Sequence, residues 1–166
     1  MTLSKSVDTT TEHLNRRELR TEKLKALGHR EPAVVQSGTG IGDAVTAMQA
    51  NGGECVLVCD GERLVGILTE RDVLRKVLAR GVAGDELVDG FMTRDPDTLT
   101  AESTVGEALE LMDRGGYRNI PLMGPDGRAR GVLRQQDILE FVAEAFPQEI
   151  LNLPPRPHQV MEQDGG

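Results

Sequence analysis

The sequence predicts a mixed α/β (α+β) fold in which two copies of one β-α-β-β-α unit pack together pseudo-symmetrically. The first observation is an internal repeat: residues 66–72 have an imperfect copy at 131–137, each with a glycine, two apolar β-formers and an aspartate that opens a helical pattern. The second is that residues 40–48 correspond to residues 104–112, ahead of these copies. Because a unit of roughly 50 residues is near the lower limit for independent stability, we expect the two units to share one interior.

The charge and composition narrow the possible functions. A net charge of −8 without a basic stripe argues against nucleic acid as a partner, because phosphate backbones are bound mainly through clustered Lys and Arg. With no signal-peptide pattern and no membrane-length apolar run, we expect no membrane partner and a cytoplasmic location. Cys55 and Cys59 fit a reducing compartment and are expected to fill the core. Scattered histidines and the lack of a carboxylate pair predict no metal, no catalytic cofactor and no enzymatic activity.

The two ends of the chain differ from the repeats. Residues 1–28 form the predicted N-terminal helical segment. Strong helix formers from Thr11 to Leu27, with Gly28 as a C-cap, predict one helix packed on the edge of the module, and a solvated lead-in is the alternative. The proline-rich tail, residues 147–166, cannot be one regular element. Three apolar tail residues are expected to dock on the body: Ile150, Leu151 and Leu153.

The first unit is predicted over residues 29–81. Its expected elements are a strand at 33–36, a helix at 41–51, strands at 54–59 and 63–68 joined by the Asp60-Gly61 turn, and a helix from Thr69 to about Gly81. The apolar spacing predicts that the two helices turn these residues toward the core: Ile41, Ala44, Val45, Met48, Val73, Leu74, Val77 and Leu78. The glycines in residues 38–42 lack the Gly-Lys-Ser/Thr ending of a phosphate loop, so we exclude that interpretation.

The second unit repeats this order over residues 91–146, after a polar linker at 82–90. Its expected elements are a turn and short strand at 91–100, a helix at 105–114, strands at 117–123 and 128–133, and a helix that ends at Phe146 before Pro147. The helix at 105–114 is expected to bury Ala108, Leu109, Leu111 and Met112.

Thr69 and Asp72 stand where the last strand of the first unit becomes a helix. Ser/Thr-x-x-Asp/Glu ahead of an apolar run is typical of a capping box, which satisfies the free amides at a helix start. The second unit keeps Asp137 but replaces the threonine with Arg134, which cannot cap in this way. The alternative is that Asp72 and Asp137 accept hydrogen bonds from vicinal hydroxyls such as those of a ribose, because a carboxylate can take two hydroxyl donors at once.

Further motifs point to a known family. Residues 92–98 read Met-Thr-Arg-Asp-Pro-Asp-Thr, and residues 117–122 read Tyr-Arg-Asn-Ile-Pro-Leu. Together with the two Gly-apolar-apolar motifs that end in Asp72 and Asp137, they resemble a tandem pair of CBS domains, or Bateman module, in a standalone CBS domain-containing protein. The resemblance covers roughly residues 27–146.

The resemblance implies a regulatory energy sensor. Such pairs bind an adenosine nucleotide (AMP, ADP or ATP) or a related ligand in clefts between the repeats, form homodimers through helices, and signal to a protein partner. It implies Thr69 and Asp72 as ribose contacts of the first cleft, Asp137 as the ribose acceptor of the second, and Arg118 as a phosphate contact. The other lining residues it implies are Val35, Gly53, Cys55 and Val56 in the first cleft, and Thr98, Tyr117, Asn119, Ile120 and Pro121 in the second.

Two positions depart from the family pattern, because Arg134 replaces the usual Ser or Thr and Leu57 replaces the strand proline. Arg134 either contacts a phosphate or plugs the second cleft. Arg71, with Arg75 and Lys76, forms a basic cluster that is either simply solvated or offsets a triphosphate. The alternative function is a structural protein-interaction module whose clefts are filled by its own side chains and bind no nucleotide.

Overall fold

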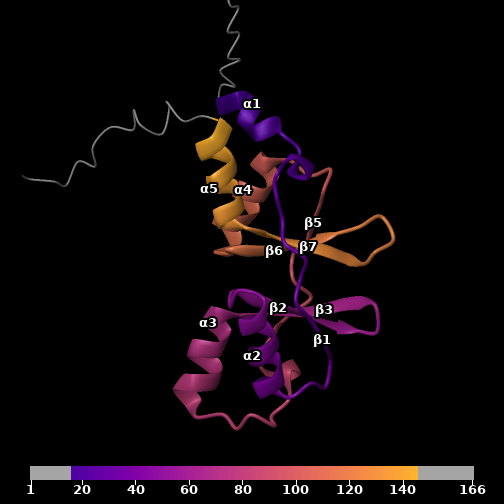
Figure 1. Ribbon diagram of the computed structural model, residues 1–166, viewed down its shortest axis with the longest axis vertical. Coiled ribbons are helices and arrows are strands. Elements are labelled where there is room, and N and C mark those ends of the chain that lie inside the picture. Colours follow the sequence, from indigo (N-terminus) through magenta and orange to yellow (C-terminus); the bar gives the residue numbers. More distant parts are fainter. Residues whose placement is uncertain (1–15, 146–166) are drawn as a thin grey trace, which may run out of the picture.

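The computed structural model describes residues 16–145, which form two units stacked on one another (Figure 1). The first unit contains β1 (Val34–Gln36), α2 (Ile41–Ala50), β2 (Cys55–Asp60), β3 (Arg63–Thr69) and one continuous helical segment made of α3 (Glu70–Asp72), the π-helical η2 (Val73–Val77) and the 3₁₀ turn η3 (Leu78–Arg80). The second contains β5 (Leu99–Thr100), α4 (Val105–Gly115), β6 (Asn119–Met123), β7 (Ala129–Arg134) and α5 (Gln135–Ala145). The predicted α+β fold with a repeated β-α-β-β-α unit is confirmed.

Each unit has its own small sheet. The first sheet has the order β1-β2-β3-β4, where β4 is the two-residue strand Thr93–Arg94, and the second has the order β5-β6-β7. In both, the first strand runs parallel to the second and the second strand forms an antiparallel hairpin with the third. The sheets face each other across the middle of the molecule, with α2 and α3 on one outer side and α4 and α5 on the other (Figure 1).

Side-chain alternation along the strands decides which face meets which neighbour. Val56 and Val58 point to the core under the helices of the first unit, whereas Leu57 between them points to the second unit. There Leu57 packs with Ile67 and Val132 in a cluster that joins the two sheets. Leu57 occupies the position that matches Pro121 of the second unit. Leu57 pairs with Ile67 and Pro121 pairs with Val132, and each of these partners directly follows the glycine of the repeated motif. The absent proline is therefore replaced by an apolar interface residue.

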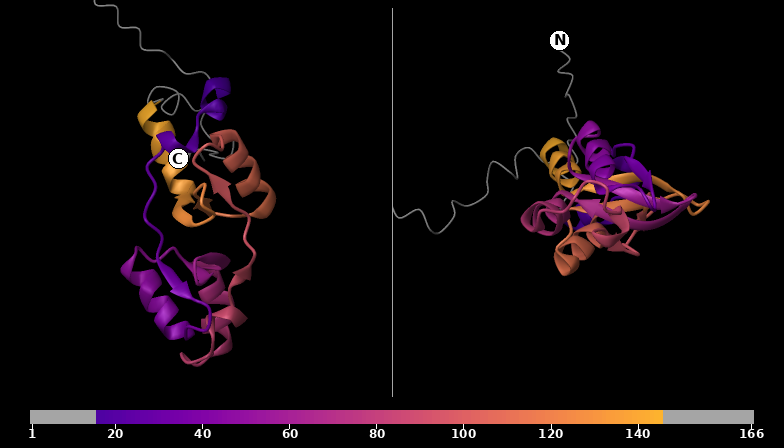
Figure 2. Two further views of the ribbon diagram at one scale, coloured as in Figure 1. Left: turned by 90° about the vertical axis from the view of Figure 1, so that its right-hand side faces the viewer. Right: turned by 90° about the horizontal axis from the view of Figure 1, so that it is seen from below.

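The segment that precedes each unit packs on the other unit. The N-terminal segment, with α1 (Arg16–Thr21) and the 3₁₀ turn η1 (Leu24–Ala26), places Leu24 and Leu27 in the core of the second unit. The chain between the two units packs in the opposite direction. Val88 of the linker and Met92 just after it are buried in the core of the first unit. The two connecting segments run along opposite sides of the molecule (Figure 2, left). The units are thus tied together twice, in addition to the contact between their sheets.

The N-terminal prediction needs a correction. The helix does not continue to Leu27: α1 ends at Thr21, and Lys23 is extended and pairs with Thr104. The backbone amides of Leu24 and Lys25 donate instead to carbonyl oxygens of residues 103 and 101. Pairing with the second unit therefore replaces helical hydrogen bonds that favourable helix propensity would otherwise support. The predictions for residues 1–15 and for the tail after residue 146, including Ile150, Leu151 and Leu153, lie outside the described residues.

The last helical segment of the first unit also differs from expectation. Val73 and Val77 are buried as predicted, but Leu74 is 54% exposed and Leu78 is 65% exposed. Only one stripe of this helix touches the core, and residues one position further on lie about 100° around its axis. Leu74 and Leu78 therefore form an apolar surface strip rather than part of the core.

No helix within residues 16–145 is both long and apolar enough to cross a membrane.

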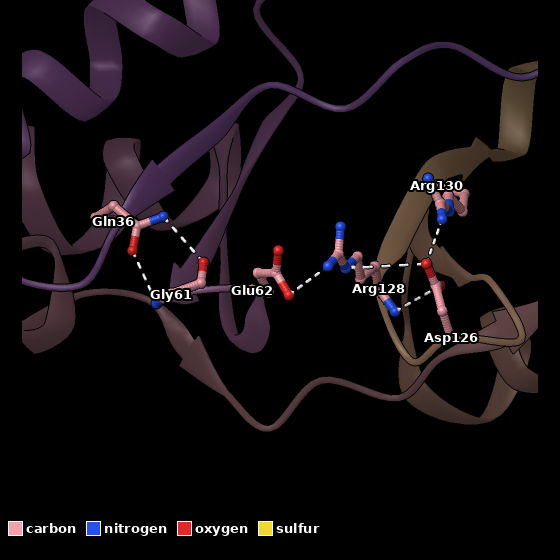
Figure 3. Close-up of polar contacts among 6 residues, drawn as sticks. All are labelled: Gln36, Gly61, Glu62, Asp126, Arg128 and Arg130. Atoms are coloured by element: carbon pink, nitrogen blue, oxygen red, sulfur yellow. Dashed lines mark hydrogen bonds and ion pairs between the residues drawn. The ribbon is translucent and has the colours of Figure 1, made fainter.

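The hairpin tips of the two sheets are joined by an ion pair, Arg128 Nη2 to Glu62 Oε2 at 2.6 Å (Figure 3). Behind it, Gln36 accepts a hydrogen bond from the Gly61 amide at 2.9 Å and so braces the first turn. Both charged side chains are more than half exposed, so the pair contributes only about 0–1 kcal/mol. The ion pair connects the tip of the first hairpin to the tip of the second.

The glycine that opens each repeated motif makes room for the crossing segment. A Cβ on Gly66 would lie 2.3 Å from the Met92 sulfur, and one on Gly131 would lie 2.6 Å from the His29 ring. Met92 lies between the linker and β4, and His29 lies between η1 and β1, so both glycines make room for a connecting segment. The repeated glycine is therefore a packing requirement rather than a turn.

We expect Gly66→Ala to lower the free energy of unfolding by about 1–3 kcal/mol, because buried Met92 cannot move aside without disturbing the core. Urea denaturation followed by circular dichroism measures this change. Gly28→Ala is the matched control, since a Cβ there meets no atom within 4 Å. Equal midpoints for the wild type and both variants would contradict the packing role.

Candidate functional site

A cavity of about 670 Å³ lies between the two units. One wall comes from the end of β3 and the start of α3, and the facing wall comes from the loop between α4 and β6. The polar ends of both units therefore converge on one cleft. Its lining residues are Glu54, Ile67, Thr69, Glu70, Arg71, Asp72, Leu74, Arg75, Thr93, Pro96, Asp97, Gly115, Gly116, Tyr117, Arg118, Asn119, Arg134, Gln135 and Gln136.

Thr69 and Asp72 form the capping box that their spacing predicts. The Thr69 hydroxyl accepts from the Asp72 amide at 3.3 Å, and Asp72 Oδ2 accepts from the Thr69 amide at 3.0 Å and from its hydroxyl at 2.9 Å. Asp72 Oδ1 accepts from Lys76 Nζ at 2.8 Å, one helical turn on. A carboxylate has about four acceptor positions, and these bonds use three. The Asp72 carboxylate therefore caps the helix and still offers an acceptor position to the cavity it lines.

The facing wall places an aromatic ring and an amide at the cavity. The Tyr117 ring lies against the backbone of Gly115, where a Cβ would come within 2.1 Å of it. The Tyr117 hydroxyl donates to Asp97 Oδ2 at 3.0 Å, and this bond is the main reason that the pKa of Tyr117 is raised. Asn119 Oδ1 is buried and has no hydrogen-bond partner among residues 16–145. A buried acceptor without a donor is costly.

Three arginines line the same cavity: Arg71 and Arg75 on the first unit and Arg118 on the second. Within residues 16–145, none of these guanidinium groups forms an ion pair. The fourth arginine of the cavity, Arg134, differs because it is fully engaged. The lining as a whole is formally balanced, because four carboxylates (Glu54, Glu70, Asp72 and Asp97) offset the four arginines. The three guanidinium groups without ion pairs can nevertheless bind an anionic group of a ligand.

Arg134 fills the part of the cleft near Asp137. Its backbone amide donates to Asp137 Oδ2 at 2.8 Å, and its guanidinium grips both carboxylate oxygens. A further nitrogen, Nη1, reaches Glu54 Oε1 of the first unit at 3.4 Å. The Arg134 side chain is 13% exposed and that of Asp137 5% exposed. The hydrogen bond that the Arg134 guanidinium donates to Asp137 is the main cause of the raised pKa of Arg134.

The cleft has two halves, which we name by their aspartates. The Asp72 half comprises Thr69 and Asp72 of the first unit with Tyr117, Arg118 and Asn119 of the second. The Asp137 half comprises Arg134 of the second unit and Glu54 of the first, both in the lining, and Asp137 pairs with Arg134 from outside the lining. This differs from the expected grouping, in which each aspartate faced the strand start of its own unit. The cause is the face-to-face stacking of the sheets, which sets each helix start opposite the other unit.

The structure brings seven predicted ligand residues to the cavity and leaves eight away from its lining. Those in the lining are Thr69, Arg71, Asp72, Tyr117, Arg118, Asn119 and Arg134. Those outside it are Val35, Gly53, Cys55, Val56, Thr98, Ile120, Pro121 and Asp137. Val56, Ile120 and Pro121 are less than 2% exposed, so their side chains belong to the core. Glu54 lies within the strand entry at residues 53–56 expected to line the first cleft, and it does line the cavity. Lining residues not expected from sequence include Asp97, Gln135 and Gln136, and only their nearness to the predicted motif residues along the chain could have suggested them.

Cys55 is also better described as a core residue. It packs against the cluster that joins the two sheets, and burial raises the pKa of its thiol to about 12. A thiol with that pKa stays protonated near neutral pH and is a poor nucleophile. Cys59 is 5% exposed, in agreement with the prediction that both cysteines fill the interior.

Comparison with known proteins identifies the family. The sequence model of the CBS domain matches residues 24–79 and again residues 86–144, which together are more than half of the chain. This chain therefore belongs to the CBS-domain family and contains a tandem pair of such domains, as the resemblance implied. An uncharacterized 17.7 kDa protein in the bps2 3' region of Acidianus ambivalens is 29% identical over 117 residues, which cover 70% of both chains. The chain spans 45% of MK0525 from Methanopyrus kandleri, at 34% identity over 89 residues.

Solved structures share the fold. The CBS domain pair of MJ0100, in complex with 5'-methylthioadenosine and S-adenosyl-L-methionine, has a TM-score of 0.67 and 21% identity, and the match covers 75% of this chain and 98% of that one. CBSX2 in complex with AMP has a TM-score of 0.61 and 20% identity, with coverage of 74% and 96%. At these identities the likeness establishes the architecture, and the ligands are properties of those two proteins.

Proposed function

We propose that this chain is a non-enzymatic regulatory module that binds an adenosine nucleotide (AMP, ADP or ATP) in the Asp72 half of the cleft. The observation that carries the proposal is the Asp72 carboxylate, which lines the cavity with an acceptor position to spare and faces Arg118 and Asn119 of the other unit. The cavity volume of about 670 Å³ falls within the range of small-molecule sites.

Each part of a nucleotide has a suitable group in this half. The remaining lone pair of Asp72 suits a ribose hydroxyl. The Tyr117 ring in the cavity lining offers a surface for the adenine base, next to Asn119. Arg71, Arg75 and Arg118 suit phosphate, because a guanidinium forms two parallel hydrogen bonds with such oxygens.

The arginines also distinguish between the ligands found in structural neighbours. AMP carries a phosphate, whereas S-adenosylmethionine carries a sulfonium cation near the ribose. Three arginines without ion pairs repel a cation and attract an anion. The three arginines, rather than the net charge of the cleft, therefore support a ligand with a phosphate over S-adenosylmethionine for this chain.

Signalling to a partner follows from the position of the cleft. A ligand held by both units links α3 to the loop before β6, so that its binding favours one relative arrangement of the units. We propose that a protein partner reads this arrangement. The cytoplasmic location expected from the sequence remains a prediction.

A second candidate function is a structural interaction module with closed clefts. It is favoured by the fact that Asp72 and Asp137 already have hydrogen-bond partners from their own units. In that case a thermal shift screen with AMP, ADP, ATP and S-adenosylmethionine would show no rise in melting temperature, because only a ligand that binds the folded state raises it.

Asp72→Ala is expected to weaken nucleotide binding by about 1.5–3 kcal/mol, through the loss of a hydrogen bond to a charged acceptor. It also removes a helix cap, which costs about 0.5–2 kcal/mol of stability. Glu107→Ala is the matched control, because Thr104 and Glu107 form the same capping box on α4 without lining the cavity. Calorimetric titration with AMP, ADP and ATP separates the two effects. Equal affinities in both variants would remove Asp72 from the ligand site.

Arg118→Ala is expected to weaken ATP binding by about 1.5–3 kcal/mol while leaving adenosine binding unchanged, since only ATP carries the charge that Arg118 would contact. Arg80→Ala is the control, because Arg80 lies outside the cavity lining at the end of the same helical segment that carries Arg71. Calorimetry with adenosine and ATP at one salt concentration measures both. A proportional loss for the two ligands would place Arg118 away from the phosphates.

We also propose that the chain forms a homodimer through its exposed helical strip. Leu74 and Leu78 on the first unit and Leu139 on α5 are each more than half exposed, and their helices lie on the same side of the molecule (Figure 1). Apolar surface gathered in this way is typical of an interface.

Leu78→Asp is therefore expected to convert the dimer into a monomer, as measured by size-exclusion chromatography with light scattering. Leu87→Asp is the control, because Leu87 is similarly exposed but lies in the linker. A wild-type chain that is monomeric at micromolar concentration would contradict the proposed dimer.

A further inference from the structure

The internal repeat makes the two halves of the cleft directly comparable. The carbonyl oxygen of Glu54 accepts from the Glu70 amide at 3.0 Å, and that of Arg118 accepts from the Gln135 amide at 2.8 Å. Glu54 and Arg118 therefore occupy equivalent places in the two units. In the strand registers, Thr69 pairs with Cys55 and Arg134 pairs with Asn119, so Thr69 and Arg134 are equivalent as well.

At these two pairs of equivalent positions, the two halves of the cleft carry side chains of different charge and size. The Asp72 half combines the small hydroxyl of Thr69 with the arginine of the other unit, Arg118. The Asp137 half combines the long side chain of Arg134 with a carboxylate of the other unit, Glu54. A nucleotide there would meet Glu54 where the Asp72 half offers Arg118, so the phosphate would be repelled rather than held.

Arg134 also neutralises the Asp137 carboxylate, whereas in the first unit a lysine on the helix neutralises the equivalent carboxylate, Asp72. Asp72 is neutralised by Lys76, one turn further along the helix. The residue at the equivalent distance after Asp137 is Phe141, which cannot do so and packs against the core of the second unit. Arg134 pairs with both oxygens of Asp137, and it stands at the cavity wall where Asp137 itself does not. Its guanidinium thus covers the carboxylate that a ribose would need.

We propose that Arg134 is a built-in occupant of the Asp137 half, so that the chain binds one nucleotide, in the Asp72 half only. The inference rests on the proposed nucleotide binding and adds its stoichiometry and the residue that sets it. Arg134 and Glu54 together keep the second half closed, the first by filling it and the second by its charge.

Calorimetric titration of the full chain with ADP tests the proposal. The wild type is expected to bind one ADP per chain. The double variant Arg134→Thr with Glu54→Arg copies both residues of the Asp72 half and is expected to bind two. Adding Asp137→Ala to that double variant is the matched control, and it is expected to return the stoichiometry to one by removing only the new ribose acceptor.

Two ADP molecules per wild-type chain would overturn the proposal, and so would a folded double variant that gains no site. If the wild type binds no ADP, the proposed function fails separately. In that case a site gained by the double variant would still support the role of Arg134, whereas a double variant that gains no site would overturn that role.

A measurement on the wild type covers the case in which the variants do not fold. The nuclear magnetic resonance signal of the Arg134 side-chain Nε–H is expected to keep its position when ADP saturates the protein, while that of Arg118 shifts. Displacement of the Arg134 signal on saturation would show that the ligand enters the Asp137 half, and would overturn the proposal.

Discussion

Each unit buries one face of its sheet under its own helices and leaves the other face to be covered by the sheet of its neighbour. Leu57, Ile67 and Val132 supply that contact, and a unit alone would expose them to water. The packing of two sheets on each other is thus the condition for the whole molecule. Beyond the apolar patch the strands end in polar residues, and there the sheets can no longer pack tightly. The cleft lies at that transition.

The crossing segments make this arrangement hard to undo. Leu24 and Leu27 lie in the core of the second unit although they precede the first, and Met92 lies in the core of the first although it leads into the second. Gly66 and Gly131 leave the space through which these segments pass. Separation of the units would therefore open both cores, so that the cleft is held by the same contacts that stabilise the fold.

The strand-to-helix junctions show how one residue can both stabilise a helix start and line the cavity. Asp72 satisfies amides at a helix start, is neutralised by Lys76, and keeps an acceptor position toward the cavity. Asp137 begins from the same local pattern but meets Arg134, whose planar guanidinium fits a carboxylate closely. In a partly buried site, removing one partner of such a pair is costly, because it leaves the other partner charged and without compensation. The exchange of threonine for arginine therefore gives two junctions with the same local pattern different carboxylate partners.

Much of the fold could be predicted from the sequence, because the repeat, the Asp60-Gly61 turn and the apolar spacing of α2 and α4 are local signals that the short-range geometry obeys. The sequence also identified the residues at the junctions, Thr69, Asp72, Arg134 and Asp137. What it could not determine is which residues face each other across the molecule. The crossing of the connecting segments, the exposure of Leu74 and Leu78, and the meeting of Arg134 with Glu54 all depend on contacts between residues far apart in the chain. Local periodicity carries no information about those contacts, and only the stacking of one sheet on the other decides them.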